Sequence, residues 1–200
     1  MSQSYRELRD RARSLALATL FDKATARDRS CDLLQLGLEL EKIIEIASEP
    51  MLAMIRMQYW SDLFENTSMP PETAAFVKRL ADDTGLPNSD ILEIIQQTQT
   101  SLQSPTPSVA WDVIFTVMAK ANHWQIDAPI LAQLGRNIGA LCNADNSAQF
   151  SALQDAQITK ASHGSYGFPR LVNLLINRQF SGKQTHDYLL VFRYLWRVLR

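Results

Sequence analysis

The sequence predicts an all-α protein on three observations. Apolar residues recur at three- and four-residue steps along most of the 200 residues, which is the period of a helix with one buried face. No segment alternates apolar and polar residues, and no Asn-Gly or Asp-Gly hairpin signal occurs. Prolines and helix-capping residues fall between the periodic segments. The length suits one continuous core, so we expect residues 1–200 to form a single antiparallel helical bundle.

The periodic segments place the helices in order. They are expected at residues 5–21, 28–47, 50–66, 72–84, from 88, 109–124, 128–143, 147–160, from 169 and from 185. Apolar residues leave the 28–47 helix little polar face, so it should be central and buried. Pro50 is tolerated in a first turn, where its missing N–H breaks no bond. Gly85 takes the position just after a helix end that favours glycine, and Asn88-Ser89-Asp90 should cap the helix that follows.

Two features concern how the helices join. Residues 103–108 hold the one Pro-rich stretch, which we interpret as a loop inside the bundle because apolar helices flank it. The 128–143 helix carries small residues at three- and four-residue steps: Ala128, Ala132, Gly135 and Gly139. Such a stripe should let another helix approach closely.

Composition narrows the function classes. The formal net charge is −1, which argues against a nucleic-acid-binding protein because phosphate neutralisation needs many cations. Cys31 and Cys142 lie far apart and form no CxxC pair, so we expect reduced thiols. No apolar run approaches the roughly 20 residues of a spanning helix. We therefore expect a cytoplasmic protein, with a peripheral position at the inner membrane left open.

One segment resembles a known family. Read with its flanks, "LELEKIIEIASEPMLAMIRMQYWSDLF" is similar to squalene/phytoene synthases, in particular to the branch that includes the mitochondrial complex I assembly factor and its bacterial relatives. "SEPMLAMIRMQYW" mirrors that branch's "SEPmlgeiRlqWW" signature, with Tyr59 in place of the first Trp. Further on, "APILAQLGRNIGAL", which includes Asn137, resembles the family's "LGxAxQLTN" helix. The fold implied is that of trans-isoprenyl diphosphate synthases, a helical bundle around an apolar cavity.

The resemblance also implies a chemistry, and this chain lacks residues for it. Active members ionise an allylic diphosphate with Mg²⁺ held by two Asp-rich motifs on facing helices. Mg²⁺ takes oxygen ligands, and an i, i+4 spacing puts two carboxylates on one helix face. Glu39 can stand for the first acid of the first motif, but Ile43 follows four residues later, and Glu45 lies on a different face. After "LGRNIGAL" no four-residue Asp pair follows. We therefore expect no metal site, no cofactor and a non-catalytic member, with Mg²⁺ relevant only if the protein is an enzyme.

The Ser48–Trp60 segment has a structural and a functional interpretation. Met51, Ile55, Tyr59 and Leu63 share one helical face, with Met54, Trp60 and Phe64 beside it, which is ordinary core patterning. Arg56 fits that pattern least. If Arg56 points inward it must find a carboxylate, and Glu39 or Glu45 on the preceding helix could supply it. The candidate residues for a cavity or ligand site are Glu39, Glu45, Arg56, Tyr59, Trp60 and Asn137.

Two function classes follow. The first is a non-catalytic assembly or interaction factor, with a protein partner or an anionic membrane surface. The second is a prenyltransferase or isoprenoid-binding protein that holds a prenyl chain in its cavity. The missing acids favour the first. A third interpretation, an unrelated helical module, stays open if the match of the Ser48–Trp60 segment is accidental.

The last segment, "THDYLLVFRYLWRVLR", is amphipathic. At about 100° per residue, Tyr188 aligns with Phe192, Leu195 and Leu199, while Arg193, Arg197 and Arg200 cluster on the far side. One interpretation is a terminal helix that docks its apolar face on the bundle. The other is a basic surface that attracts anionic lipid or an acidic partner, and the two are compatible.

Overall fold

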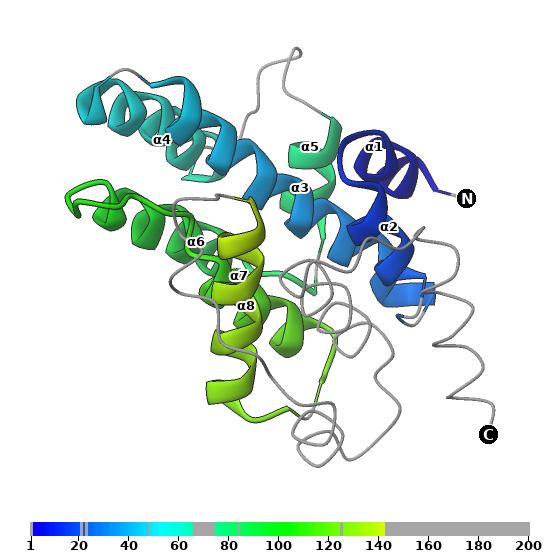
Figure 1. The fold of residues 1–200 in the computed structure, drawn as a ribbon. Helices are drawn as coiled ribbons and strands as arrows, with labels where there is room; N and C mark the ends of the chain where they lie inside the picture. The colour runs from blue at the N-terminus through cyan, green and yellow to red at the C-terminus, as the bar shows by residue number, and fades with distance from the viewer. Residues whose placement is uncertain are drawn as a thin grey trace.

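The computed structural model describes residues 2–20, 22, 24–47, 49–65, 75–83, 85–124 and 126–142. Within these residues every regular element is a helix, as Figure 1 shows, so the expected all-α class is confirmed for this part of the chain. The helices are α1 (Gln3–Arg11), α2 (Arg13–Thr19), α3 (Ala24–Ile46), α4 (Pro50–Glu65), α5 (Ala75–Asp82), α6 (Asn88–Ser101), α7 (Trp111–Ala121) and α8 (Ala128–Cys142). The helices expected beyond residue 143 lie outside the described residues. None of α1 to α8 is long and apolar enough to cross a bilayer.

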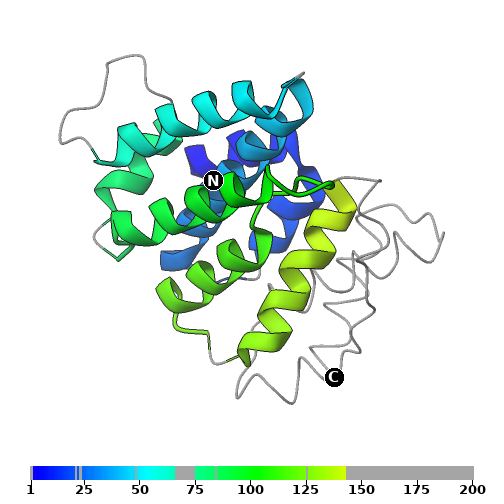
Figure 2. The same cartoon turned by 90° about the vertical axis from the view of Figure 1, so that its left-hand side faces the viewer.

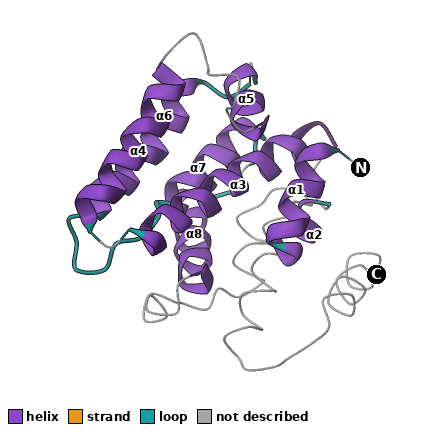
Figure 3. Ribbon diagram, turned by 90° about the horizontal axis from the view of Figure 1, so that it is seen from above, coloured by secondary structure: helices purple, strands orange, loops and turns teal. Residues whose placement is uncertain are grey.

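α3 is the central helix, as its apolar sequence predicted. It packs against α1, α2, α4, α5 and α7. Leu33, Leu34, Leu36 and Leu40 on it are fully buried. Seen from above in Figure 3, α4 and α6 lie on one side of the molecule and α1 and α2 on the other, with α3 and α7 between them. α3 thus separates two groups of surface helices.

The first predicted helix is interrupted. Residues 5–21 were expected to form one helix, but Ala12 has φ −142° and ψ 76°, and the chain divides into α1 and α2 there. Both helices then pack on α3. The sequence around Ala12 is a good helix former, so this break is a case of tertiary packing overriding local propensity.

α7 and α8 cross closely, which confirms the prediction from the small-residue stripe. A Cβ at Gly135 would stand 2.4 Å from the Cα and backbone nitrogen of Asp112. The indole of Trp111 fills the space over two other glycines, since a Cβ at Gly37 would meet it at 2.4 Å and one at Gly139 at 3.1 Å. Glycine is therefore required at Gly135 by the backbone of the facing helix, and Figure 2 shows α8 lying across α7.

Buried ion pairs tie α3 to α1 and α5. Both oxygens of Asp32 on α3 accept hydrogen bonds from the Arg79 guanidinium, at 2.9 and 2.7 Å, and Arg79 also donates to Glu7 at 2.8 Å. The Asp32 side chain is 4% exposed. Burial raises the pKa of Asp32, and the hydrogen bond from Arg79 opposes that rise. The carboxylate therefore depends on Arg79 for its charge to be tolerated in the core.

A second pair joins α3 to the end of α5. Arg29 donates to both oxygens of Asp83, at 2.5 and 2.7 Å, and to the Ala121 carbonyl oxygen at 2.7 Å. The guanidinium of Arg29 holds the pKa of Asp83 below its usual value.

α6 returns along α4 in the opposite direction. The Asn88 side-chain amide at the start of α6 donates to the Phe64 carbonyl oxygen near the end of α4, at 3.0 Å. Asn88 was expected to cap α6, but it is the first helical residue, and Pro87 precedes it without a side-chain cap. Asp90 accepts from Lys120 on α7 at 2.8 Å. The polar residues at this helix start therefore bond to neighbouring helices instead of capping their own.

Candidate functional site

The sequence-predicted site residues do not converge. Glu39 is half-buried and accepts a hydrogen bond from Arg11 of α1 at 2.7 Å, whereas Glu45 is exposed near the end of α3. Trp60 lies beside Phe76 of α5, with ring centroids 5.8 Å apart. Asn137 is fully buried in α8, where its side-chain oxygen accepts from Gln133 at 2.8 Å.

Arg56 contradicts the predicted internal ion pair. It is exposed on α4, and Glu39 pairs with Arg11 instead. A buried unpaired charge is costly, so the outward position of Arg56 is the expected one once Glu39 is engaged elsewhere.

The buried face of α4 is also not the predicted one. Met51, Ile55 and Tyr59 were expected inside but are 70%, 61% and 51% exposed. The residues that pack inward are Ala53, Met57, Ser61, Leu63 and Phe64, so the prediction was right for Leu63 and Phe64. Trp60, which was also predicted beside that face, is partly buried against the core. Apolar residues surround almost the whole of α4, so periodicity could not select a face. The small Ala53, which is 1% exposed, sits on the face that packs inward.

The three glutamates of α3 have three different surroundings. Glu39 bonds Arg11, Glu45 is exposed, and Glu41 is buried, where its carboxylate accepts from the Trp111 indole nitrogen at 2.8 Å. Ile43, at the position where a second acid would be needed, is 7% exposed and belongs to the core.

Glu41 is the functional-type residue that sequence reasoning missed. Burial raises its pKa, the hydrogen bond from Trp111 lowers it, and the charge of Glu45 raises it further. The available signal was its i, i+4 spacing to Glu45, which puts the two acids on one face of α3. The structure uses Glu41 to join α3 to α7, because its carboxylate is bonded to an indole in the core.

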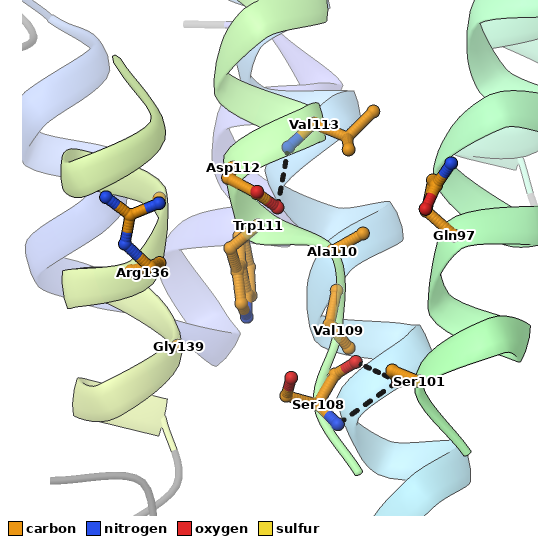
Figure 4. Close-up of a pocket in the computed structure, with 11 residues that line it drawn as sticks. Gln97, Ser101, Ser108, Val109, Ala110, Trp111, Asp112, Val113, Arg136 and Gly139 are labelled. Atoms are coloured by element: carbon orange, nitrogen blue, oxygen red, sulfur yellow. Dashed lines mark hydrogen bonds between the residues drawn. The ribbon is translucent and has the colours of Figure 1, made fainter. Parts of the chain in front are cut away.

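In one recess among the described residues, the lining residues Asp90 and Lys120 form an ion pair with each other. Two other recesses in this part of the chain remain as candidates. The first lies between α6, α7 and α8 and is shown in Figure 4, with Gln97 and Ser101 on one side and Arg136 on the other. Two of its lining residues bond to each other: Ser101 donates to the Ser108 carbonyl oxygen at 2.5 Å and accepts from the Ser108 amide at 3.2 Å. This recess therefore fixes the loop before α7 onto α6.

The second recess is a groove between α4 and α6. α4 contributes Met51, Met54, Ile55 and Gln58 to it, α6 contributes Gln96, Gln99 and Thr100, and Gln103 lies in the turn just after α6. No charged side chain lines it. It continues into a larger apolar surface, which we call the α4 face and define as Met51, Leu52, Met54, Ile55 and Tyr59, all exposed.

The α4 face is the feature that a folding argument explains least. Exposed apolar side chains gathered in a patch mark interaction sites more often than bare surface. Methionines and depletion of charge are typical of the centre of protein interfaces. The charge-free groove is thus suited to an apolar partner.

A metal site needs several ligating side chains that converge on one ion. Across the described part of the chain, no group of three or more His, Cys, Asp or Glu side chains is placed to hold one ion. Cys31 is buried, and burial raises the pKa of its thiol to about 12, so this thiol stays protonated at neutral pH.

Comparison of the chain with protein-family models, with curated proteins and with solved structures finds no match.

Proposed function

We propose that this chain is a non-catalytic protein with a squalene/phytoene synthase-like, trans-isoprenyl diphosphate synthase-like fold, and that it acts as an assembly or interaction factor. The observation that carries the proposal is how the fold uses the glutamates of α3. Their carboxylates meet an arginine, an indole and solvent, where a synthase of this family would aim them at one metal cluster.

The proposal that the protein is non-catalytic follows from the ligands that Mg²⁺ requires. The ion needs several hard oxygen ligands that converge, and clamping the diphosphate by metal is commonly a large catalytic term. Glu39 is neutralised by Arg11, and its i+4 neighbour is the core residue Ile43. Glu41 has the correct spacing to Glu45, but Glu41 is buried and already bonded to Trp111. Using Glu41 as a ligand would require breaking a core contact, and using Glu39 would require breaking its pair with Arg11.

The proposal that the protein binds a partner rests on the exposed α4 face. This face lies in the same Ser48–Trp60 segment that carries the family resemblance, so the part most similar to a synthase is here an exposed apolar surface. A protein partner with an apolar helix fits a groove lined by two helices.

An assay of prenyl diphosphate condensation tests whether the protein is an enzyme. The purified protein is incubated with farnesyl or geranylgeranyl diphosphate and Mg²⁺, and products are separated and measured. We expect no condensation product and no released pyrophosphate above background. Product formation that disappears when Glu39 is changed to Gln would overturn the proposal.

The alternative function is isoprenoid binding without chemistry, and the apolar α4–α6 groove favours it. Here the test is binding of a fluorescent prenyl diphosphate analogue to the wild type and to Met54→Glu. Saturable binding that the substitution weakens at least about tenfold supports the alternative, whereas equal binding by both proteins rejects the groove as its site.

A peripheral membrane role stays a prediction about Arg193, Arg197 and Arg200, which lie outside the described residues. Co-sedimentation with anionic vesicles at low and high salt tests it, with the triple change of these residues to Gln as the matched control. Sedimentation that is equal for both proteins, or absent at low salt, contradicts the role.

A further inference from the structure

The α4–α6 groove has the form of a seat for one more helix. Its α4 wall consists of Met51, Met54, Ile55 and Gln58, and its α6 wall of Gln96, Gln99 and Thr100, continued by Gln103 in the turn just after α6. Each wall follows the spacing i, i+3, i+4, i+7, so each helix presents a single stripe to the groove. Two adjacent stripes of this kind accept a third helix whose own apolar stripe lies along them.

The chemistry of the groove restricts the occupant. No side chain that lines it carries a charge, and its apolar atoms come from Met and Ile. An anionic lipid or a diphosphate would find no cation among these lining residues. An amphipathic helix with large apolar residues on one face and its charges turned away would be accommodated.

Residues 185–200 of this chain meet that description. Tyr188, Phe192, Leu195 and Leu199 align on one side of the predicted helix, and its arginines lie on the other. At about 1.5 Å per residue, sixteen residues span about 24 Å, which equals the length of the sixteen-residue α4. The groove wall from Met51 to Gln58 takes up about half of that length, about 12 Å, so the aromatic-rich stripe would fill the groove and continue along α4.

Charge favours the same pairing. Residues 143–200 hold seven Lys or Arg against three Asp, whereas residues 1–142 hold thirteen Lys or Arg against eighteen Asp or Glu. The exposed Asp62 and Glu93 prolong the two groove walls at the end where Asn88 bonds Phe64. The terminal segment as a whole is thus basic and the body acidic, which favours their association through the long-range field and not through a contact of the arginines with the groove.

The chain between α8 and residue 185 is also long enough to reach the groove. Forty-two residues separate Cys142, the end of α8, from Thr185. At about 3.3 Å per extended residue, such a tether can reach any point on a molecule of this size. The segment can therefore arrive within its own chain.

We propose that residues 185–200 dock as a helix in the α4–α6 groove of the same chain and cover the α4 face. The inference rests on the proposed function in taking the α4 face as the interaction surface, and it names the occupant of that surface in the free protein. An outside partner that uses the same face then competes with the chain's own terminal helix.

Photo-cross-linking of the full chain tests the docking. p-Benzoylphenylalanine replaces Ile55, which is exposed in the α4 face, or Arg9 on α1 as a control position on the other side of the molecule (Figure 3). After irradiation, the monomer band is digested and the cross-linked peptides are identified. We expect cross-links from position 55 to residues 185–200 within the monomer, and none to this segment from position 9.

Two tail variants sharpen the test. Phe192→Glu with Leu195→Glu should lower the cross-link yield at least about tenfold, because carboxylates would enter an apolar groove. Arg193→Gln with Arg197→Gln, which changes only the outer face, should leave at least about half of the yield. The docking would be overturned by cross-links from position 55 to other segments, by the absence of any cross-link, or by equal yields in both variants. Cross-linked dimers alone would also overturn it and would assign the groove to a second copy. Prenyl turnover would contradict the non-catalytic proposal without affecting this readout, so the two failures are distinguishable.

Discussion

Arg79→Met should destabilise the protein strongly, because it removes the cation from a buried carboxylate. Arg79 donates to both oxygens of Asp32, whose side chain is 4% exposed. After the substitution Asp32 keeps the hydrogen bond from Ser4, at 3.1 Å, and the longer one from Gln35, at 3.4 Å. Those bonds compensate a part of the lost interaction, but they leave the charge without a counter-ion.

The magnitude follows from the burial of Asp32. Removing one partner of a buried pair costs about 3–5 kcal/mol. The two remaining hydrogen bonds and the partial exposure of Arg79, at 29%, place this case at the lower end, at about 3 kcal/mol. For a chain of this size 1 kcal/mol corresponds to roughly 2–4 °C, so the melting temperature should fall by about 6–12 °C.

The assay is thermal unfolding followed by circular dichroism, with Arg9→Met as the matched control. Arg9 pairs with Asp10 at 2.9 Å, but both side chains are largely exposed, and such a pair contributes little. Adding Asp32→Asn to Arg79→Met should recover much of the loss, because the buried charge is then gone. A melting temperature for Arg79→Met within about 1 °C of that for Arg9→Met would refute the reasoning about the core.

Two further predictions concern the contacts around Trp111. Gly135→Ala should lower the free energy of unfolding in urea by about 1–2 kcal/mol, since its new Cβ meets the rigid backbone of the facing helix at 2.4 Å. Gly139→Ala should cost less, because its Cβ meets an indole at 3.1 Å. Equal effects of the two substitutions would contradict the close crossing. Glu41→Gln should raise the melting temperature at pH 7, because the amide oxygen still accepts from Trp111 without a buried charge. The pKa of Glu41 is raised in the folded protein, so wild-type stability falls as pH rises through that pKa. The stability advantage of Glu41→Gln should therefore vanish below the unfolded pKa of about 4.3. An advantage that is constant with pH would contradict this prediction.

The sequence predicted the parts of the fold that depend on strong local patterns. The leucine-rich α3 was expected to be central, and the small-residue stripe of α8 was expected to allow a close helix approach; both follow from side-chain size and period. The break at Ala12 could not be predicted, because its cause is the packing of α1 and α2 on α3. The orientation of α4 failed for a related reason, since a helix that is apolar on nearly all sides has no preferred face until its neighbours are known.

The candidate site was predictable in its acids but not in their partners. Glu39 and Glu45 were identified by their position before Ser48, yet which cation Glu39 would meet depended on a residue 28 positions earlier, Arg11. Glu41 has the i, i+4 spacing to Glu45 that a motif needs, and its use in the core became visible with Trp111, 70 residues away. Long-range partners of this kind leave no periodic signal.

The central claim, that the glutamates of α3 serve the fold and not a metal, can be measured directly by calorimetry. Farnesyl diphosphate is titrated into the wild type with and without Mg²⁺, and then into Glu39→Gln and Glu45→Gln. We expect that Mg²⁺ produces no increase in affinity and that both variants behave like the wild type. Affinity that rises at least about tenfold with Mg²⁺ and is lost in both variants would contradict it.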